Sequence, residues 1–249
     1  MNNEFYSQER QQELNHHLGV SGELSLGRYA ARVFGIMFLG LLVTFVVGYY
    51  LAWTKSGFRL LVTAFDRVPF LHLGLMVAEL VLVFTLSSAL QRLSPAAALA
   101  LFFAYALLTG CTFGVIFLVY DVTSLVLAFG ATALYFGGMA VFGWLTQIDL
   151  TRIRVLLTGG LIFLIVMNLL MLFIPGLQAA DHLLCTVGVV VFLGLTAYDT
   201  QKIKGFYQAY QYDQAMLTKV AALAALQLYL DFVNLFLYVL RFLGRSKRR

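Results

Sequence analysis

Seven apolar runs, each long enough to cross a lipid bilayer, constrain this chain of 249 residues more than any other feature of its sequence. A helix needs about 20 apolar residues to span the hydrocarbon core of a bilayer. Membrane-spanning strands would instead alternate apolar and polar residues, and these runs do not alternate. The sequence therefore predicts an all-α integral membrane protein with seven transmembrane helices, at residues 30–53, 70–93, 96–120, 122–146, 154–174, 182–204 and 217–243.

The composition leaves room for one membrane domain and excludes a second, soluble one. Hydrophobic residues make up 61% of the chain and charged residues 12%, whereas soluble domains are about half apolar and about a quarter charged. We divide the chain into a polar N-terminal arm (1–28), a seven-helix domain (29–244) and a basic C-terminal tail (245–249). The arm lacks the apolar run of a signal peptide. The tail flanks a membrane helix, which favours contact with lipid headgroups and not with nucleic acid.

Short connections follow the second, third and fourth runs, so consecutive helices should be antiparallel neighbours. Small residues recur within the runs, and such residues let helices approach closely. The glycines that predict this close packing are Gly110 and Gly114, Gly137 and Gly138, and Gly188 and Gly194. We interpret Asn168, in the fifth run, as a residue that hydrogen-bonds a neighbouring helix.

The distribution of basic residues predicts a cytoplasmic N-terminus, because cytoplasmic loops carry an excess of Lys and Arg. In this orientation the cytoplasmic side holds Arg10, Arg28, Arg32, Arg92, Arg152, Arg154, Lys202, Lys204 and Lys219, against Lys55, Arg59 and Arg67 outside. The C-terminal end disagrees, since seven full spans place Arg241 and the basic tail outside. Either the rule is weak for a last helix or the seventh run does not cross fully; we favour seven spans.

Three of the 12 acidic residues lie inside apolar runs: Glu79 in the second, Asp199 in the sixth and Asp231 in the seventh. A carboxylate at mid-membrane costs about 2.5–3.5 kcal/mol on insertion scales. Such residues therefore indicate a functional site that faces the bundle interior or a water-filled path. Asp199 also allows a simpler interpretation, because it lies three residues before Lys202 and could reach interfacial water from a helix end.

Gln227, Asp231 and Asn234 are spaced i, i+4 and i+7, so they share one face of the helix. A polar stripe facing lipid would be costly, so we expect the seventh helix to be central with this stripe turned inward. If Asp199 faces Asp231, the two carboxyls cannot easily both ionise in a dry site and titrate as a unit. Their oxygens would also suit a hard cation such as Ca²⁺. The sequence alone leaves open whether the two side chains meet.

The last two runs carry motifs that are specific to a known family. The stretch TAYDTQKIK (196–204), followed by LYLDFVNLFLYVLRFLG (228–244), resembles the transmembrane Bax inhibitor motif family, and ELVLVFTLSSAL (79–90) fits the same pattern. The resemblance extends over residues 30–244, and the bacterial branch of the family is the most similar. It implies a fold in which six helices wrap a central C-terminal helix, and a pH-sensitive Ca²⁺ leak across the membrane.

The resemblance also implies roles for individual residues. Asp199 and Asp231 match the family's carboxyl pair, which shares a proton and acts as the pH sensor and ion gate, and Glu79 matches its pore acid. The family's latch, an Arg late in the second helix, falls near Leu90; the nearest arginine is Arg92, two residues on and about 200° around a helix. Arg92 is therefore only a candidate latch. The connection between the two aspartate helices, which contains FYQAYQYDQAML (206–217), looks long.

Three classes of function follow from these observations. The first is a passive, pH-gated cation pathway in the inner membrane of a bacterium, with Gln227 and Asn234 supporting the gate and Ca²⁺ transiently contacting Glu79, Asp199 and Asp231. It needs protons and Ca²⁺ but no cofactor, and the chain has no phosphate-binding loop. The second is a regulatory protein whose N-terminal arm docks on a membrane protease or on a stress or cell-death partner.

The third class is an enzyme, which we do not expect. Two helix-borne aspartates resemble the arrangement in intramembrane aspartyl proteases. However, the second aspartate of those enzymes lies in a GxGD motif, whereas Asp231 lies in LYLD and no further helix follows. A retinal protein would need a lysine deep in its last helix, and Lys219 lies at the entrance of this one.

Overall fold

The computed structural model describes residues 25–68 and 70–243, and these residues form helices without any strand. The elements are α2 (Leu26–Trp53), α3 (Lys55–Arg67), α4 (Leu71–Ser88), α5 (Pro95–Val119), α6 (Val122–Leu145), η1 (Leu150–Ile153), α7 (Arg154–Phe173), η2 (Pro175–Ala180), α8 (Asp181–Tyr210) and α9 (Gln214–Leu243). Seven of them, all but α3 and the two short 3₁₀ helices, are long and apolar enough to cross a membrane. The predicted all-α fold with seven spans is confirmed.

Local sequence determines where several of these helices begin. Ser25, Ser94 and Asp121 each accept a hydrogen bond from a backbone N–H of the first helical turn, which satisfies a donor that the helix leaves free. The Asp121 carboxylate accepts from both the backbone and the hydroxyl of Ser124, at 2.9 and 2.7 Å. These hydrogen bonds lower the pKa of Asp121, which lies between two spanning helices. The polar residues at the helix starts thus separate the long apolar runs into individual spans.

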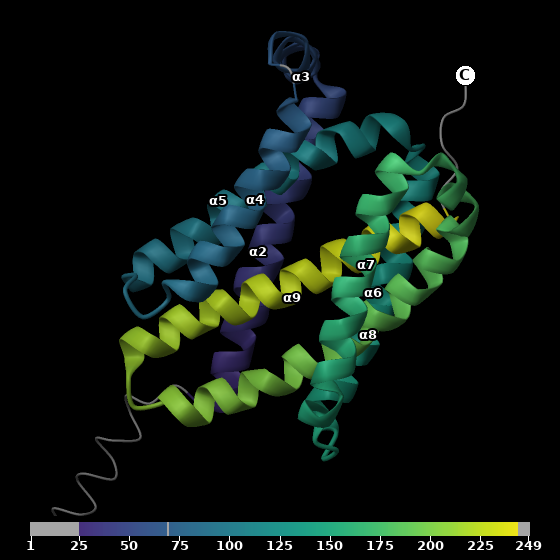
Figure 1. Cartoon of the computed structure of the whole chain (residues 1–249). Helices are drawn as coiled ribbons and strands as arrows, with labels where there is room; N and C mark the ends of the chain where they lie inside the picture. Colours follow the sequence, from purple (N-terminus) through teal and green to yellow (C-terminus); the bar gives the residue numbers. More distant parts are fainter. Residues whose placement is uncertain (1–24, 69, 244–249) are drawn as a thin grey trace, which may run out of the picture.

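The last helix, α9, lies at the centre of the bundle (Figure 1). It packs against α2, α4, α5, α6 and α8, and it reaches α7 through a hydrogen bond from Asn168 to Tyr238. Small residues on α9, such as Ala221, Ala224 and Ala225, are fully or almost fully buried. Most of α9 is buried, as expected for a central helix, and one stripe along its middle is only half-buried: Leu223, Gln227, Leu230, Asn234 and Leu237.

Contacts between helix ends show that the spans alternate in direction. Five helix ends meet at one end of the bundle, which we call the N-terminal end because α2 begins there. The contacts that join these ends are Tyr29–Tyr207, Lys204–Trp144 and Lys219–Gln91. At the opposite end, Arg241 of α9 pairs with Asp181 of α8. The helix α9 therefore runs the full length of the bundle, which supports seven complete spans.

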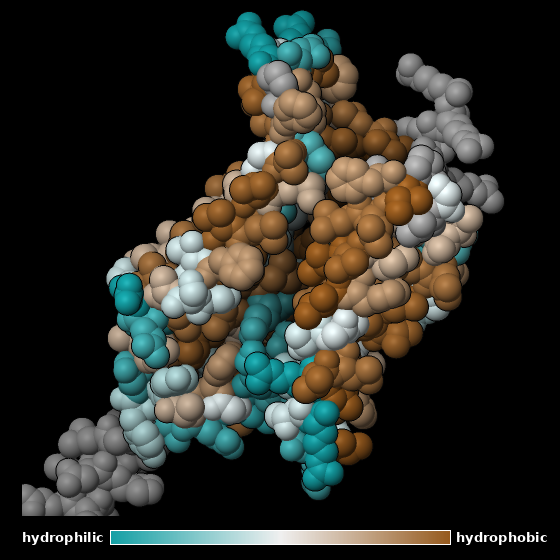
Figure 2. Space-filling view, in the orientation of Figure 1, coloured by the Kyte–Doolittle hydropathy of each residue, from teal (hydrophilic) through white to brown (hydrophobic). Residues whose placement is uncertain are grey.

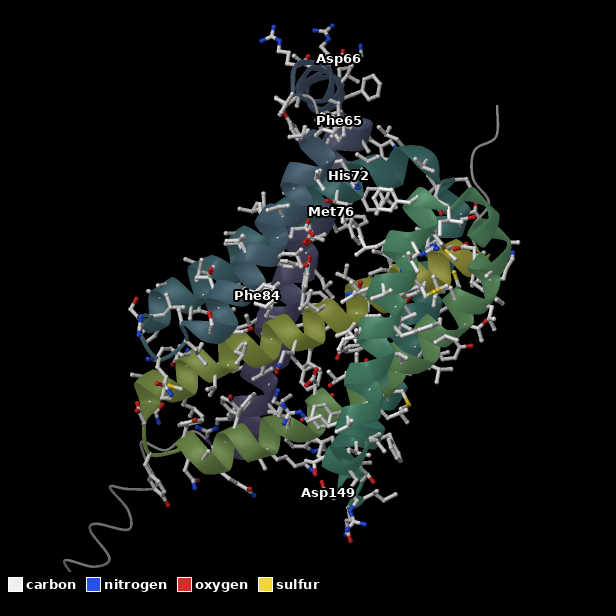
Figure 3. The ribbon with its side chains drawn as sticks, in the orientation of Figure 1. Phe65, Asp66, His72, Met76, Phe84 and Asp149 are labelled. Carbon is white, nitrogen blue, oxygen red and sulfur yellow. The ribbon has the colours of Figure 1, made fainter. Side chains whose placement is uncertain are left out.

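The surface of the bundle is polar at its two ends and apolar between them. Figure 2 shows hydrophobic residues over most of the visible face, with hydrophilic residues gathered on α3 at one end and around the lower connections at the other. Asp66 and Asp149 mark these two ends in Figure 3. An apolar belt between two polar ends is the surface expected of a protein that spans a bilayer.

Two segments differ from the sequence-based expectation. Residues 55–67, interpreted as part of an outer loop, form the helix α3. The connection between the two aspartate helices is short and not long, because α8 continues through Tyr210 and α9 begins at Gln214. The more polar sequence after Lys204 ends the apolar run but not the helix, since it extends beyond the apolar belt. Residues 1–24 of the N-terminal arm and the tail 245–249 lie outside the described residues.

Glycines bring the helices into close contact at most of the predicted positions. A Cβ atom added at Gly110 would lie 2.7 Å from Val47, one at Gly114 3.0 Å from Leu51, and one at Gly188 2.6 Å from the ring of Tyr238. Gly194 likewise lies against Leu157. The α2–α5 and α8–α9 interfaces thus depend on the missing side chains of these residues.

The prediction for Gly137 and Gly138 is wrong. A Cβ at either position meets no atom of the described residues within 4 Å, because this side of α6 faces away from its neighbours. The glycine of α6 that does permit close packing is Gly143, where an added Cβ would collide with the backbone of Ala197 in α8.

We therefore expect Gly143→Ala to destabilise the protein, because neither backbone can move without shifting a whole helix. Overpacking of this kind costs about 1–3 kcal/mol. Thermal unfolding in detergent measures the effect. Gly138→Ala, on the same helix, is the matched control and should leave the melting temperature unchanged or slightly raised. Equal effects of the two substitutions would contradict the close α6–α8 contact.

Candidate functional site

The side chain of Asp231 is buried at the middle of the central helix. It is 3% exposed, and its Oδ2 atom accepts no hydrogen bond from any residue that the structure describes. A buried polar atom without a partner is costly, and a buried carboxylate more so. The carboxyl of Asp231 is therefore the least satisfied acidic group described in the bundle, and its neighbours determine what it can do.

Asp199 of α8 approaches Asp231 from the side. The two carboxyls interact electrostatically, and the side chain of Asp199 is 11% exposed. The α8 and α9 helices pack along much of their length, which Gly188 permits by accommodating Tyr238. The structure thus brings together the two aspartates that the sequence singled out.

Lys202 supplies positive charge beside this pair. Its ammonium lies 3.8 Å from Oδ1 of Asp199 on the same helix and donates a hydrogen bond of 3.2 Å to Oε1 of Gln227 on α9. It also lies over the rings of Tyr198 and Phe206. Lys202 therefore links α8 to the polar stripe of α9. Asp199 is mostly buried and does not lie at a helix end, because α8 continues through Tyr210; the simpler interpretation of Asp199 as a helix-end acid is therefore wrong.

A pocket lies beside Lys202, toward the N-terminal end of the bundle. It is lined by Thr151, Tyr198, Gln201, Lys202, Gly205 and Phe206. Gln201 holds the α6–α7 connection in place, because it accepts from the N–H of Leu150 at 3.0 Å and donates to the carbonyl of Ile148 at 2.8 Å. Figure 2 shows hydrophilic residues within a hollow of this face, between hydrophobic surfaces. Lys202 thus lines the pocket and contacts Asp199 as well.

Two further members of the polar stripe and its surroundings behave differently. Asn234 donates to the carbonyl of Leu230 on its own helix at 2.8 Å, so it makes no described contact with the pair. Thr200, next to Asp199, is fully buried, and its hydroxyl has no hydrogen-bond partner among the described residues. Thr200 carries no signal in the sequence, because one threonine in an apolar run is common.

Glu79 lies apart from the aspartate pair, between α4 and α5. It is half-buried, and the hydroxyl of Thr112 donates to its Oε1 at 3.3 Å. The described residues contain no cluster of three His, Cys, Asp or Glu side chains that could hold a metal ion. Glu79 therefore does not join Asp199 and Asp231 in one coordination site.

Tyr229 faces the Glu79 side of the central helix. Because it lies two residues before Asp231, it points about 200° away around α9. Its hydroxyl forms a 2.5 Å hydrogen bond with Thr44 of α2, whose own hydroxyl also reaches the carbonyl of Ala106 at 2.9 Å. The ring of Tyr229 also packs edge-on against Phe102 and Tyr105 of α5. The central helix thus presents an acid to α8 and a tyrosine to α2, α4 and α5. Both residues belong to the motif LYLD, in which only the charge of Asp231 signals a functional role.

Arg92, the candidate latch, is exposed in the turn after α4. Its guanidinium forms no ion pair or hydrogen bond with the residues that the structure describes, whereas the neighbouring Leu90 is buried. The role of Arg92 stays a prediction.

A second polar cluster joins three helices at the opposite end of the bundle. Arg241 of α9 pairs with Asp181 of α8 and donates to Oδ1 of Asn168 of α7 at 3.0 Å. The amide of Asn168 in turn donates to the hydroxyl of Tyr238 at 2.9 Å. The predicted interhelical role of Asn168 is confirmed. Arg241, which the sequence grouped with the basic tail, instead belongs to the bundle. Because α8 and α9 are antiparallel neighbours, the start of α8 lies beside the end of α9. This arrangement could have predicted the pairing of Arg241 with Asp181.

We expect Asn168→Leu to destabilise the protein by about 1–3 kcal/mol, because the hydroxyl of Tyr238 loses its hydrogen-bond partner and Arg241 keeps Asp181 but loses the amide oxygen. Asn234→Leu is a closely matched control, since both amides donate to the carbonyl four residues earlier on their own helix. Only Asn168 also bridges helices in the described structure. Thermal unfolding in detergent should show a clear loss for Asn168→Leu and a small one for the control; similar losses would argue against the cluster.

Several known proteins are similar to this chain over most of its length. A family model described as "Inhibitor of apoptosis-promoting Bax1" matches residues 26–248. A relative in Escherichia coli K12, inner membrane protein YbhL, is 40% identical over 229 residues, which cover 92% of this chain and 96% of the relative. A protein of Borreliella burgdorferi is 38% identical over 220 residues, or 88% and 93% of the two chains. One of Deinococcus radiodurans is 37% identical over 220 residues, or 88% and 90%. The family match extends over all seven spans.

Proposed function

The chain belongs to the family of inhibitors of apoptosis-promoting Bax1, and we propose that it is a passive, pH-sensitive pathway for cations, with Ca²⁺ as the cargo. Its relative in Escherichia coli is named an inner membrane protein, and we propose the same location here, with the N-terminus in the cytoplasm. The observation that carries the proposal is the buried carboxyl of Asp231, which lies beside Asp199 and has one oxygen without a hydrogen-bond partner among the described residues.

The aspartate pair acts as the gate because its charge depends on pH. Two neighbouring carboxyls in a dry site do not readily carry two negative charges, so a proton is shared and the pair titrates as a unit. Loss or gain of that proton changes the attraction for Lys202 and, through Gln227, the contact between α8 and α9. Protonation therefore shifts the balance between two arrangements of these helices.

Glu79 acts separately, as the acidic group that attracts the cation. A half-buried carboxylate beside the hydroxyl of Thr112 offers oxygen atoms, which are the ligands that Ca²⁺ prefers. A site with only a few oxygen ligands binds the ion weakly. Conduction requires weak binding, because an ion that binds tightly does not leave. The hydrogen bond between Tyr229 and Thr44 holds the central helix against α2 on this side of the bundle. Sensing and attraction thus lie on different sides of α9.

We expect Asp199→Asn and Asp231→Asn to abolish the pH dependence of Ca²⁺ flux, because an amide keeps the shape of the side chain and cannot titrate. The measurement is Ca²⁺ influx between pH 6 and 8 into liposomes that contain a Ca²⁺ dye and the purified protein. Asp66→Asn, at an exposed aspartate of α3, is the control and should retain the wild-type pH profile. A profile that survives both substitutions in the pair would refute the gate.

We expect Glu79→Gln to lower Ca²⁺ flux about tenfold at every pH, the change that about 1.4 kcal/mol of lost attraction produces. The shape of the pH profile should remain, since Glu79 does not belong to the aspartate pair. Thr112→Val, which removes only the hydroxyl, should give a smaller loss. If Glu79→Gln instead removes the pH dependence, the division of roles between the two sides of α9 is wrong.

A protein that folds but carries no Ca²⁺ beyond empty liposomes would contradict the transport proposal itself. Deletion of residues 1–24 separates transport from docking on a membrane partner, because none of the three acids belongs to the arm. Flux that is unchanged by this deletion supports the pathway. Flux that depends on the arm would favour a regulatory role for it.

A further inference from the structure

The helix α3 separates its polar and apolar residues completely. At 100° per residue, the six polar residues occupy one arc of 120°, and the seven apolar ones occupy the remaining arc. The polar residues are Lys55, Ser56, Arg59, Thr63, Asp66 and Arg67; the apolar ones are Gly57, Phe58, Leu60, Leu61, Val62, Ala64 and Phe65. All six polar residues are exposed. A short helix with this pattern is typical of a segment that lies at the boundary between an apolar and an aqueous phase.

The bundle covers only the centre of the apolar arc. Gly57 and Leu61 are buried; Gly57 lies against the backbone of Tyr50, and Leu61 reaches the position of Gly114 in α5. On either side of this contact, Phe58 is 46% exposed and Leu60 is 59% exposed. Val62 and Phe65 are also exposed. The buried centre fixes the side of α3 that faces the bundle, and the flanks extend beyond it.

The direction of α3 is unlike that of the spans. In Figure 1, α3 is seen nearly end-on at one end of the bundle, whereas α2 runs along the picture toward it. Thr54 turns the chain, because its hydroxyl accepts from the N–H of Gly57 at 3.0 Å and donates to the carbonyl of Tyr50 at 2.7 Å. Tyr50 also donates to Ser56 at 3.1 Å. These bonds hold α3 across the end of α2, in the direction of a membrane surface.

Aromatic residues mark the depth at which this turn occurs. Trp53, the last residue of α2, stacks on Phe117 with ring centroids 5.3 Å apart and meets Tyr49 edge-on at 4.9 Å. Both side chains are more than a third exposed on the outside of the bundle. Trp and Tyr gather where lipid headgroups meet the acyl chains. The residue that precedes α3 by two positions therefore lies at the level of the headgroups.

We propose that α3 lies in the lipid leaflet on the side of the membrane opposite to the N-terminal end, with Phe58, Val62 and Phe65 among the upper acyl chains. Its polar arc faces water. Figure 3 shows Asp66 on the outer side of α3 and Phe65 nearer to the bundle, in agreement with this placement.

The charges of α3 select the headgroups. Lys55, Arg59 and Arg67 lie on the polar arc with one acidic residue, Asp66, so the helix carries net positive charge. Long basic side chains extend from an interfacial helix to lipid phosphates while their methylene groups stay in the apolar region. Basic residues close to an anionic membrane surface are attracted to it. Anionic phospholipids are therefore the occupants that fit this surface.

Site-directed spin labelling of the full chain tests the placement. Cys111 and Cys185 are free and are first replaced by alanine. Single labels are then attached after Val62→Cys or Phe65→Cys on the apolar arc and Thr63→Cys or Asp66→Cys on the polar arc. Liposomes of phosphatidylcholine with phosphatidylglycerol contain the protein, and collision with O₂ and with a water-soluble nickel chelate is measured. Leu134→Cys, exposed in the middle of α6, and Asp149→Cys, in a connection, serve as membrane and water references.

The labels at 62 and 65 should resemble the membrane reference, with high O₂ and low nickel accessibility, and those at 63 and 66 should resemble the water reference. Water-like values at all four positions would overturn the proposal. Labels at 62 and 65 that are shielded from both reagents would also overturn it, since a second copy or another protein would then cover the apolar arc.

The headgroup preference has its own measurement. Addition of phosphatidylglycerol to phosphatidylcholine liposomes should move the labels at 62 and 65 deeper, seen as a higher ratio of O₂ to nickel collisions. The variant with Lys55→Gln, Arg59→Gln and Arg67→Gln should lose this shift while it keeps the difference between the two arcs. A shift that persists in the variant, or no shift in the parent, would overturn the role of the basic residues.

Discussion

The burial of a carboxyl group in the middle of a membrane-spanning helix is the constraint on which the rest of this structure depends. Asp231 cannot face lipid, so α9 needs a neighbour on that side. Tyr229 points the opposite way and hydrogen-bonds Thr44, so α9 needs a neighbour there too. Arg241 requires partners near the end of the helix, which Asp181 and Asn168 provide. A helix with polar groups in three directions is stable only at the centre of a bundle.

The other helices are adapted to surround this one. Glycine at 188 lets α8 approach the ring of Tyr238, and glycine at 143 lets α6 approach α8. The close contacts bring Asp199 to Asp231, and Lys202 beside them offsets part of their charge. The three polar clusters lie at different places along and around α9: the aspartate pair toward α8, Tyr229 toward α2 and α5, and Arg241 at the end opposite to the start of α2. A change of charge in one cluster can therefore alter one helix contact while the other two hold α9 in place.

Much of this could be predicted from the sequence because membrane spans and buried charges leave strong signals. The seven apolar runs predicted the seven spans, and the interruption of such runs by Glu79, Asp199 and Asp231 identified the unusual acids. Contacts made by ordinary residues left no such signal. Tyr229 is one of many aromatic residues in the chain, and Thr44 is an unremarkable residue of an apolar run. The helix α3 was missed because its apolar residues follow the helical period over only 13 residues, and the continuation of α8 was missed because polar residues were equated with a loop.

The central claim is that Asp199 and Asp231 share a proton as one unit. Infrared spectroscopy of the protein in liposomes, titrated between pH 6 and 8, observes the C=O stretch of a protonated carboxyl directly. The account predicts a band that changes with pH in the wild type, that is altered by Asp199→Asn and by Asp231→Asn, and that responds to the double substitution no more than to either single one. A titrating band that neither substitution alters, or two independent contributions that add, would contradict it.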